Sequence, residues 1–321
     1  MAPNDKYSFN KKVIGAMERA LIIYHRQDLD GTTSCAQLLR YTSDIKEWDT
    51  SVVGMAYNEP IPWDEINAAD YVYIVDFSFS PDEMKEIQSK VKRLTWIDHH
   101  VSAIDKVKTA GLSFPGIQRI DRAACYLTYE YLSSISDEVK QELYPHGPSV
   151  TLQLLEQYDR TGPTDGDIPS FALCNMGVQA ANWTDVRSEL YDKILIGNPD
   201  QSDRIAKGFI ADGRVIYGYN KNSWAIGLRG SHIARTIHGK RALTANNSNH
   251  SSAYFESMKN EDFDMYISWY INTSMTVTFS FYSDTIDVGA IAVEHGGGGH
   301  KGASGCTMSI VDAMEFLQLN K

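Results

Sequence analysis

Three short apolar segments in the first hundred residues alternate with helix-like segments, and each is followed directly by an aspartate or a histidine. They are LIIY (21–24) before His25, YVYIV (71–75) before Asp76, and RLTWI (93–97) before Asp98-His99-His100. Strands that alternate with helices favour a parallel sheet in an α/β fold. Ligands of such sheets bind beyond the carboxyl ends of the strands. We therefore expect these polar side chains to share one site.

The segments between these strands carry recognisable helix signals. SPDEMKEIQSKV (80–91) has Ser80 as a predicted N-cap and Pro81 at the first helical position. TTSCAQLLRYTSDI (32–45) predicts a helix with Thr32 or Thr33 as N-cap. Further helices are expected at residues 8–20, 123–135 and 149–162.

The second half of the chain has a different pattern. The segment 184–203 is polar and predicts a domain boundary, and residues 203–222 predict a connector helix. MYISWYI (265–271) and MTVTFSFYS (275–283) are typical of strands, and IDVGAIAVEH (286–295) of a helix before the glycine-rich run GGGGHKGASG (296–305). We predict an α/β domain at residues 1–190, a linker and connector helix at 191–222, and a smaller α/β domain at 223–321.

Composition limits the partners of such a chain. The 321 residues carry a formal net charge of -11, which does not suit coating of long nucleic acid, because phosphate neutralisation needs many basic side chains. The four cysteines are scattered, as is typical of reduced thiols. No apolar run approaches the roughly 20 residues that span a bilayer, and the first residues contain no apolar stretch of signal-peptide type. We expect a cytoplasmic protein without membrane contact.

Histidine and carboxylate side chains gather in four places: HRQDLDG (25–31), Asp76, DHH (98–100) and Asp159. Imidazole and carboxylate together suit Mn²⁺, Fe²⁺, Zn²⁺ or Mg²⁺. Asp28 and Asp30 alternate in one loop and can each reach one of two neighbouring ions, with Asp76 as the candidate bridge. Such a pair of ions, about 3.5–4 Å apart, activates water and polarises a phosphoryl oxygen, which predicts phosphoester hydrolysis.

Each feature alone has a simpler interpretation. A DHH sequence fits an exposed loop, DLDG fits a turn or helix start, and a single aspartate after a strand fits an N-cap. A run of glycines fits a flexible linker. The metal-site interpretation depends on their convergence at the strand and helix ends of one α/β domain. Four other histidines are interpreted as polar residues without a special role: His146, His232, His238 and His250.

Taken in order, these motifs resemble those of the DHH phosphoesterase superfamily. HRQDLDG, Asp76, DHH and Asp159 are similar to its four motifs, and GGGGHKGASG is similar to the glycine-histidine signature of the DHHA1 domain that follows in one branch. The spacing most resembles the nano-RNase (oligoribonuclease) and cyclic-nucleotide phosphodiesterase members. The resemblance implies a DHH domain, a helical connector and a DHHA1 domain, with a cleft between the two domains.

The resemblance also implies roles for individual residues. His100 would be a hydrogen-bond donor or general acid, and Asp98 would orient an imidazole. Substrate would be held by Gly297, Gly298, Gly299 and His300, and Tyr282, which stands where an arginine is common, could stack on a base. His25 and Asp28 lie farther apart in sequence than in some members. The implied ligands of two divalent ions, most commonly Mn²⁺, are His25, Asp28, Asp30, Asp76, His99 and Asp159.

The expected activity is hydrolysis of oligonucleotides of about two to five nucleotides, RNA or DNA, to mononucleotides, a size implied by the family. A cyclic-dinucleotide, linear-dinucleotide or 3′-phosphonucleotide phosphodiesterase is the alternative, since the same metal site serves each. A RecJ-like exonuclease would want basic tracts, and a non-catalytic nucleotide-binding protein would predict missing ligands. Long duplex nucleic acid is not an expected partner, and a homodimer is the default assembly.

Overall fold

The computed structural model describes residues 17–57, 59–161, 168–248, 252, 254–255 and 262–318. The described residues up to Gly213 form one compact unit, and those from Arg214 onward form a second. Helix α10 (Pro199–Ser231) contains this division, which falls within the connector predicted at 191–222. Among the described segments, no helix combines the length and the hydropathy that crossing a membrane requires.

The first unit is built on a five-stranded sheet in which every pairing is parallel. The chain goes from β1 to β2 on one side of β1 and then to β3 on the other, so the connections reverse direction there. Such a reversal point is where open α/β sheets bind ligands. In spatial order the strands are β2 (Asp49–Met55), β1 (Arg19–His25), β3 (Tyr71–Val75), β4 (Arg93–Asp98) and β5 (Gly116–Gln118).

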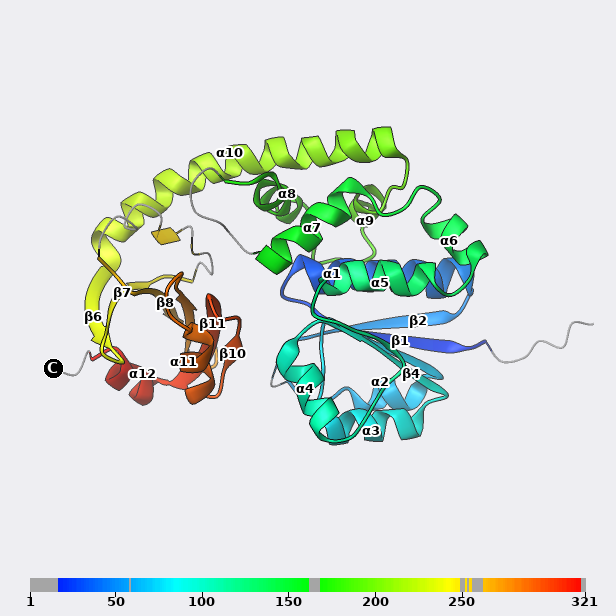
Figure 1. The fold of residues 1–321 in the computed structure, drawn as a ribbon, viewed down its shortest axis with the longest axis horizontal. Helices are drawn as coiled ribbons and strands as arrows, with labels where there is room; N and C mark the ends of the chain where they lie inside the picture. Colours follow the sequence, from blue (N-terminus) through cyan, green and yellow to red (C-terminus); the bar gives the residue numbers. More distant parts are fainter. Residues whose placement is uncertain are drawn as a thin grey trace, which may run out of the picture. The chain divides into compact units, whose positions relative to one another are not determined.

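Helices cover both faces of this sheet (Figure 1). One face carries α2 (Trp63–Ala68), α3 (Pro81–Lys90) and α4 (Val101–Thr109). The other carries α1 (Leu29–Leu39) with its π-helical extension Arg40–Ile45, α5 (Ala124–Ser133), α6 (Asp137–Leu143), α7 (Val150–Thr161), α8 (Ser170–Gln179) and α9 (Glu189–Ile194).

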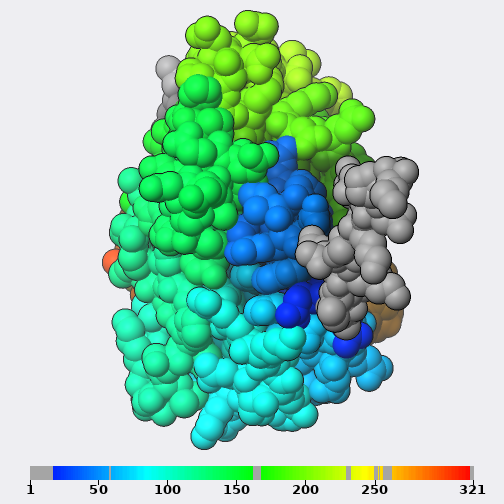
Figure 2. Space-filling view, turned by 90° about the vertical axis from the view of Figure 1, so that its right-hand side faces the viewer, coloured from blue at the N-terminus to red at the C-terminus, as the bar shows by residue number. Residues whose placement is uncertain are grey.

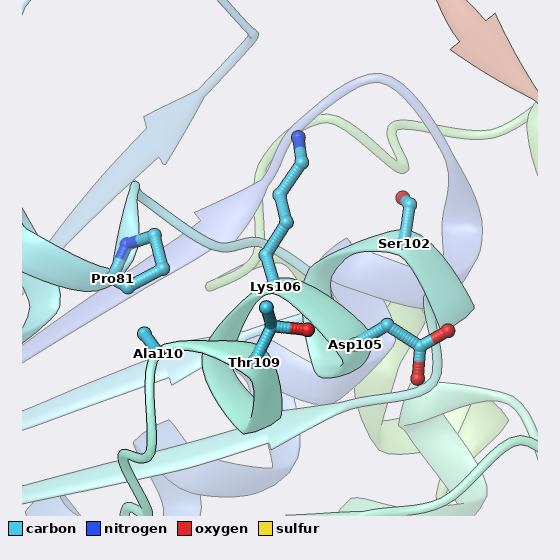
Figure 3. Close-up of a pocket in the computed structure, with 6 residues that line it drawn as sticks. All are labelled: Pro81, Ser102, Asp105, Lys106, Thr109 and Ala110. Atoms are coloured by element: carbon cyan, nitrogen blue, oxygen red, sulfur yellow. The ribbon is translucent and has the colours of Figure 1, made fainter.

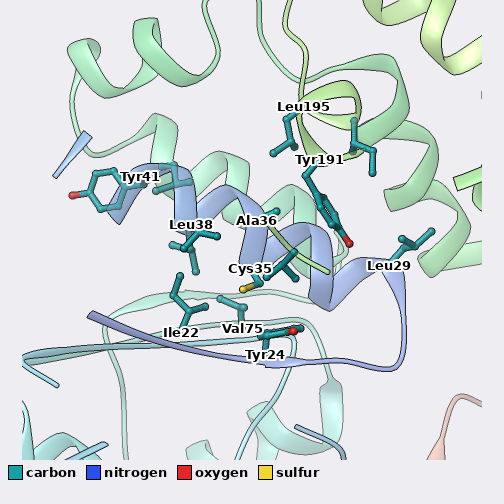
Figure 4. Close-up of a cluster of buried hydrophobic side chains, with 14 of the residues drawn as sticks. Ile22, Tyr24, Leu29, Cys35, Ala36, Leu38, Tyr41, Val75, Tyr191 and Leu195 are labelled. Atoms are coloured by element: carbon teal, nitrogen blue, oxygen red, sulfur yellow. The ribbon is translucent and has the colours of Figure 1, made fainter. Parts of the chain in front are cut away.

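Successive residues of a strand point to opposite faces of the sheet, so they pack into two different cores. Ile22 and Tyr24 of β1 pack under α1, as Figure 4 shows, whereas Leu21 and Ile23 pack against the α2–α4 side. In the space-filling view, the blue residues of the early described chain lie between green helical residues and cyan residues (Figure 2). Burial on both faces explains why the strands are continuous apolar runs.

Helix starts follow local chemistry, with one correction. Ser80 caps α3 as predicted, and Glu83 completes a capping box with it. The prediction that Thr32 or Thr33 caps the helix expected at residues 32–45 is wrong: α1 begins at Leu29, and the Asp28 side chain accepts a hydrogen bond from the Gly31 amide. Both threonines lie buried inside the helix.

The expected helix at residues 8–20 is also wrong at its end. Arg19 and Ala20 belong to β1, where they pair with Asp49 and Thr50 of β2, and residues 8–16 lie outside the described chain.

The second unit holds a six-stranded mixed sheet and confirms the predicted α/β class. Strands β8 and β9 match the two β-like runs, β7 pairs with β8 in parallel, and α11 and α12 pack on one face. The strands in order are β10 (Gly298–Gly299), β11 (Ala303–Ser309), β9 (Thr276–Tyr282), β8 (Met265–Ile271), β7 (Lys240–Asn246) and β6 (His232–Ile237). The helices are α11 (Val288–Glu294) and α12 (Ile310–Phe316).

Candidate metal centre

The loop after β1 is shaped by a glycine. A Cβ atom on Gly31 would lie 2.0 Å from the carbonyl oxygen of His25, so no larger residue fits there without movement. This contact lets α1 start directly above the end of β1, and it places Asp28 at the N-cap and Asp30 in the first turn. The carboxylates of Asp28 and Asp30 therefore lie beyond the C-terminal ends of the strands.

The first group of possible ligands contains His25, Asp28 and Asp76. Nδ1 of His25 lies 2.6 Å from Oδ2 of Asp28 and 3.5 Å from Oδ2 of Asp76. One donor atom from each of the three residues lies within 4.8 Å of the others, a spacing that one divalent ion could bridge.

The second group contains Asp30, His99 and Asp159. Nε2 of His99 lies 3.5 Å from Oδ2 of Asp30 and 3.4 Å from Oδ2 of Asp159. Asp30 is held in place by the amides of Ala124 and Cys125 at the start of α5, which donate to its two oxygens at 2.9 and 2.7 Å. A helix N-terminus thus fixes one carboxylate of the group.

Asp76 lies between the two groups. Its Oδ2 faces His25, while its Oδ1 lies 3.3 Å from Nε2 of His99. The residue is 1% exposed and has a left-handed backbone with φ of 52°. Such a conformation is uncommon outside glycine, and it concentrates at functional positions. The two oxygens of Asp76 therefore face different groups of candidate ligands.

The electrostatics of the two groups of candidate ligands favour a bound cation. Burial, and then the negative charges of Asp30 and Asp28, raise the pKa of Asp76 well above its usual range. Burial and the charge of Asp30 do the same to the pKa of Asp159. Burial lowers the pKa of His25, but Asp28 and Asp76 outweigh it and raise that pKa to about 11. Divalent ions would relieve this crowding of acids.

Orphaned oxygen atoms point to the same conclusion. Oδ1 of Asp76 and Oδ2 of Asp159 are buried, and neither has a hydrogen-bond partner within the described chain. Unpaired buried oxygens are costly. They face the histidine nitrogens at distances that leave space for ions between them. The donor set of two imidazoles and four carboxylates therefore fits two divalent ions of the Mn²⁺, Mg²⁺ or Zn²⁺ kind.

Asp98 and His100 stand beside this centre. Oδ1 of Asp98 accepts hydrogen bonds from the amides of His99 and His100, and it contacts Nδ1 of His100 at 2.8 Å. This fixes the His100 ring and leaves Nε2 as the nitrogen that a substrate would meet. Burial lowers the pKa of His100, but the bond to Asp98 outweighs it and raises that pKa.

The glycine-rich segment lies in the second unit and is ordered. A Cβ on Gly297 would lie 2.1 Å from the carbonyl oxygen of Gly305, and Gly299 has a φ of 137°. The amides of Gly297 and His300 donate to carbonyl oxygens within this unit, so they are not free for an anion. Gly298 and Gly299 are exposed and form β10, which pairs with β11.

The stacking role expected for Tyr282 needs correction. Its ring is 8% exposed and packs with Phe255 and Tyr266 in a buried cluster. The sheet of the second unit has a buried core on each face: Tyr282 belongs to one cluster and its neighbour Phe281 to the other. A base-stacking surface needs an open ring face, which Tyr282 does not offer.

Tyr57 is a candidate that sequence reasoning missed. Its ring stacks on Phe77 at 5.0 Å and lies 5.6 Å from the ring of His25. It is 48% exposed. Only the tertiary fold brings this loop residue to the metal centre, so no pattern around it in the sequence marked it.

Two arginines that contact the same buried glutamate were also missed. Buried Glu156 contacts Arg160 at 3.2 Å and Arg122 at 3.4 Å, and the Arg122 guanidinium lies over the Tyr126 ring. Glu156 is one helical turn from Asp159, while Arg122 immediately precedes Ala123, the N-cap residue of α5. The spacing of Glu156 and Arg160, four residues apart, was the available signal.

A separate pocket of about 440 Å³ opens between the start of α3 and one side of α4 (Figure 3). Its lining residues are Pro81, Ser102, Asp105, Lys106, Thr109 and Ala110. None of them is a candidate ligand of the metal centre, so this pocket is not the predicted active site.

Two solved structures with TM-scores of 0.50 or more share this fold. The DHH domain of a member of the s1p family of ribosomal proteins matches with a TM-score of 0.54 at 13% identity, covering 94% of this chain and 86% of that one. An exopolyphosphatase-related protein from Bacteroides fragilis matches with a TM-score of 0.50 at 16% identity, covering 94% and 91%. A pGpG-specific phosphodiesterase from Vibrio cholerae gives 0.48 at 14% identity, covering 94% and 97%.

A comparison with curated proteins finds no match to this chain. Residues 19–155, which contain every candidate metal ligand except Asp159, match the family described as DHH family, N-terminal domain. The chain therefore contains a DHH family domain.

Proposed function

We propose that this protein is a divalent-metal-dependent phosphodiesterase that hydrolyses short oligonucleotides of about two to five nucleotides to mononucleotides. The observation that carries the proposal is the position of Asp76, whose two oxygens face different groups of ligands. A shared carboxylate between two such groups is the arrangement that two-metal phosphoester hydrolysis requires.

The ligand groups would hold two ions, for which Mn²⁺ is our first candidate. When bound, such ions supply a nucleophilic hydroxide near neutral pH and polarise the phosphoryl oxygen. His25 and Asp28 would hold one ion, Asp30, His99 and Asp159 the other, and Asp76 both.

His100 is the proposed proton donor to the leaving oxygen. Asp98 holds Nδ1, so Nε2 is the atom that would donate. Asp98 is fully buried, and it acts through His100 by fixing the ring and stabilising its protonated form. A general acid that is oriented and held protonated by a carboxylate lowers the barrier for departure of a nucleoside alkoxide.

Three exposed side chains support a nucleotide substrate. Tyr57 offers an aromatic face beside the centre, where a base could stack. Arg122 and Arg160, held by Glu156, offer guanidinium groups for a phosphate next to the one that is cleaved. The net charge of -11 favours a short substrate, because it provides no extended basic track. Gly298, Gly299 and His300 of the second unit remain predicted substrate contacts.

A product assay tests the proposal. Protein with Mn²⁺ is offered labelled RNA and DNA of two to twenty nucleotides, cyclic dinucleotides and 3′-phosphonucleotides. We expect mononucleotides to appear fastest from the shortest linear oligomers, and the Asp76→Asn variant to release none.

Other outcomes would replace the proposal. Turnover of cyclic dinucleotides or 3′-phosphonucleotides alone would move the protein to the alternative phosphodiesterases. Preference for the longest strands would indicate a RecJ-like exonuclease. Tight binding without turnover of any of these would contradict hydrolysis and indicate a nucleotide-binding protein.

A further inference from the structure

A second cluster of potential metal ligands lies in the second unit. His238, Glu294 and His295 each offer one ligand atom within 4.8 Å of the others. Nδ1 of His238 lies 3.8 Å from a carboxylate oxygen of Glu294, and the two imidazole centroids are 6.0 Å apart. The cluster joins the turn between β6 and β7 to the end of α11.

The backbone at His238 is held in an uncommon conformation. His238 and Gly239 form a two-residue turn between the paired residues Ile237 and Lys240, with φ of 50° and 70°. Two consecutive positive φ values are typical of a type I′ hairpin, for which asparagine and glycine are the preferred pair. Histidine at the first of these positions costs conformational free energy, so a function of its imidazole would explain its presence.

His295 supplies an independent observation. Its Nε2 is buried and has no hydrogen-bond partner among the residues that the structure describes. The ring of Phe316 stands perpendicular to it at 5.1 Å and also flanks His238 at 6.1 Å. Ring packing accounts for the contacts with Phe316, but it leaves the buried nitrogen unsatisfied.

We propose that His238, Glu294 and His295 bind one Zn²⁺ ion, separately from the candidate metal centre of the first unit. Two imidazoles and one carboxylate are ligands that Zn²⁺ commonly takes, and three protein ligands leave one position for water or another donor. Phe316 excludes water from one side of the cluster, which strengthens the attraction between ion and ligands. The bound ion would tie the β6–β7 turn to the residues that directly precede Gly296–Gly299.

The proposed ligands can be removed without touching the first centre. His238→Asn keeps a residue that tolerates the left-handed turn. Glu294→Gln changes a side chain that is 61% exposed, so the fold should persist. Tm measured with a chelator present should be no lower in either variant than in the unchanged protein, which shows that each variant is folded.

The test is equilibrium dialysis of the full chain against chelator-buffered Zn²⁺, with bound metal counted per chain. We expect each variant to hold one ion fewer, its affinity at this site falling at least about 100-fold, the upper range for loss of one supporting group. Zn²⁺ should also raise Tm by less in the variants. Equal ion counts and equal Zn²⁺-induced Tm shifts in all three proteins would overturn the proposal. Both readouts are independent of phosphodiesterase activity.

Discussion

At the scale of single residues, His99 and His100 illustrate how adjacent imidazoles can take different roles. Nε2 of His99 faces Asp30, Asp76 and Asp159, whereas Nδ1 of His100 is bound to Asp98. Both histidines follow β4, whose last residue is Asp98, and His100 is the N-cap residue of α4, which starts at Val101. His99 therefore lies among the candidate ligands, and His100 lies beside them.

This difference predicts separable effects of matched substitutions. His99→Gln should lose metal at the second ligand group and, with it, activity. His100→Gln should retain the metal but lower kcat by roughly 10²- to 10⁴-fold, the usual range for a general acid. Metal counting and steady-state kinetics on both variants check this. Equal metal loss in the two variants would contradict the division of roles.

A second residue prediction concerns Tyr57. Tyr57→Ala should raise KM for a dinucleotide by about 5- to 150-fold, because one stacked base contributes about 1–3 kcal/mol. Tyr57→Phe keeps the ring and should leave KM nearly unchanged. If Phe and Ala weaken binding equally, the hydroxyl group rather than the ring face is what matters, and the stacking interpretation fails.

At the scale of elements, the strands that carry the site were predictable because their signals are local. YVYIV forms β3 with the predicted bounds, since it is a continuous apolar run buried on both faces. Ser80 and Glu83 are likewise a complete local signal for the start of α3. The strand β2 gave no such signal, because it is mostly half-buried.

The parts that could not be predicted depend on contacts between distant segments. The amides that hold Asp30 are 94 and 95 residues away in the sequence. The early start of α1 depends on Gly31 lying against the His25 carbonyl. The burial of Tyr282 follows from core on both faces of the second sheet. Candidate ligands could be predicted at the strand ends, but the contacts that support them could not.

The close approach at Gly31 gives a prediction for the loop as a unit. Gly31→Ala should push α1 away from β1, lower stability by about 1–3 kcal/mol as overpacking does, and weaken metal binding. Gly208→Ala in α10 is the matched control, since its Cβ would meet no atom within 4 Å. That control should stabilise the helix by about 0.5–1 kcal/mol. Thermal unfolding with and without Mn²⁺ measures both effects, and equal metal responses would contradict this role for Gly31.

At the scale of the whole molecule, the crowded carboxylates should make stability depend on metal and pH together. The pKa of His25 is raised from 6.5 to about 11, and those of Asp76 and Asp159 are raised above 3.8. A group whose pKa is raised by folding contributes its full stabilisation at pH values below its ordinary pKa. This contribution declines as the pH rises toward the pKa of the group in the folded protein.

Metal-free protein should therefore have a lower Tm at pH 8 than at pH 6. The Tm increase caused by Mn²⁺ should grow over the same interval, because ligands must lose protons to bind metal. Thermal scans in chelator and in Mn²⁺ at several pH values test both signs. A Mn²⁺ effect that shrinks as pH rises would contradict the proposed ligand set.

The central claim is that Asp76 joins two ions in one centre, and electron paramagnetic resonance of the Mn²⁺-loaded protein tests it most directly. Two Mn²⁺ ions that share a carboxylate are magnetically coupled, and we predict a coupled signal in the unchanged protein. Asp76→Asn keeps the shape and the left-handed backbone but removes the bridging charge, so only signals of isolated Mn²⁺ should remain. Isolated signals alone in the fully loaded unchanged protein would contradict the account.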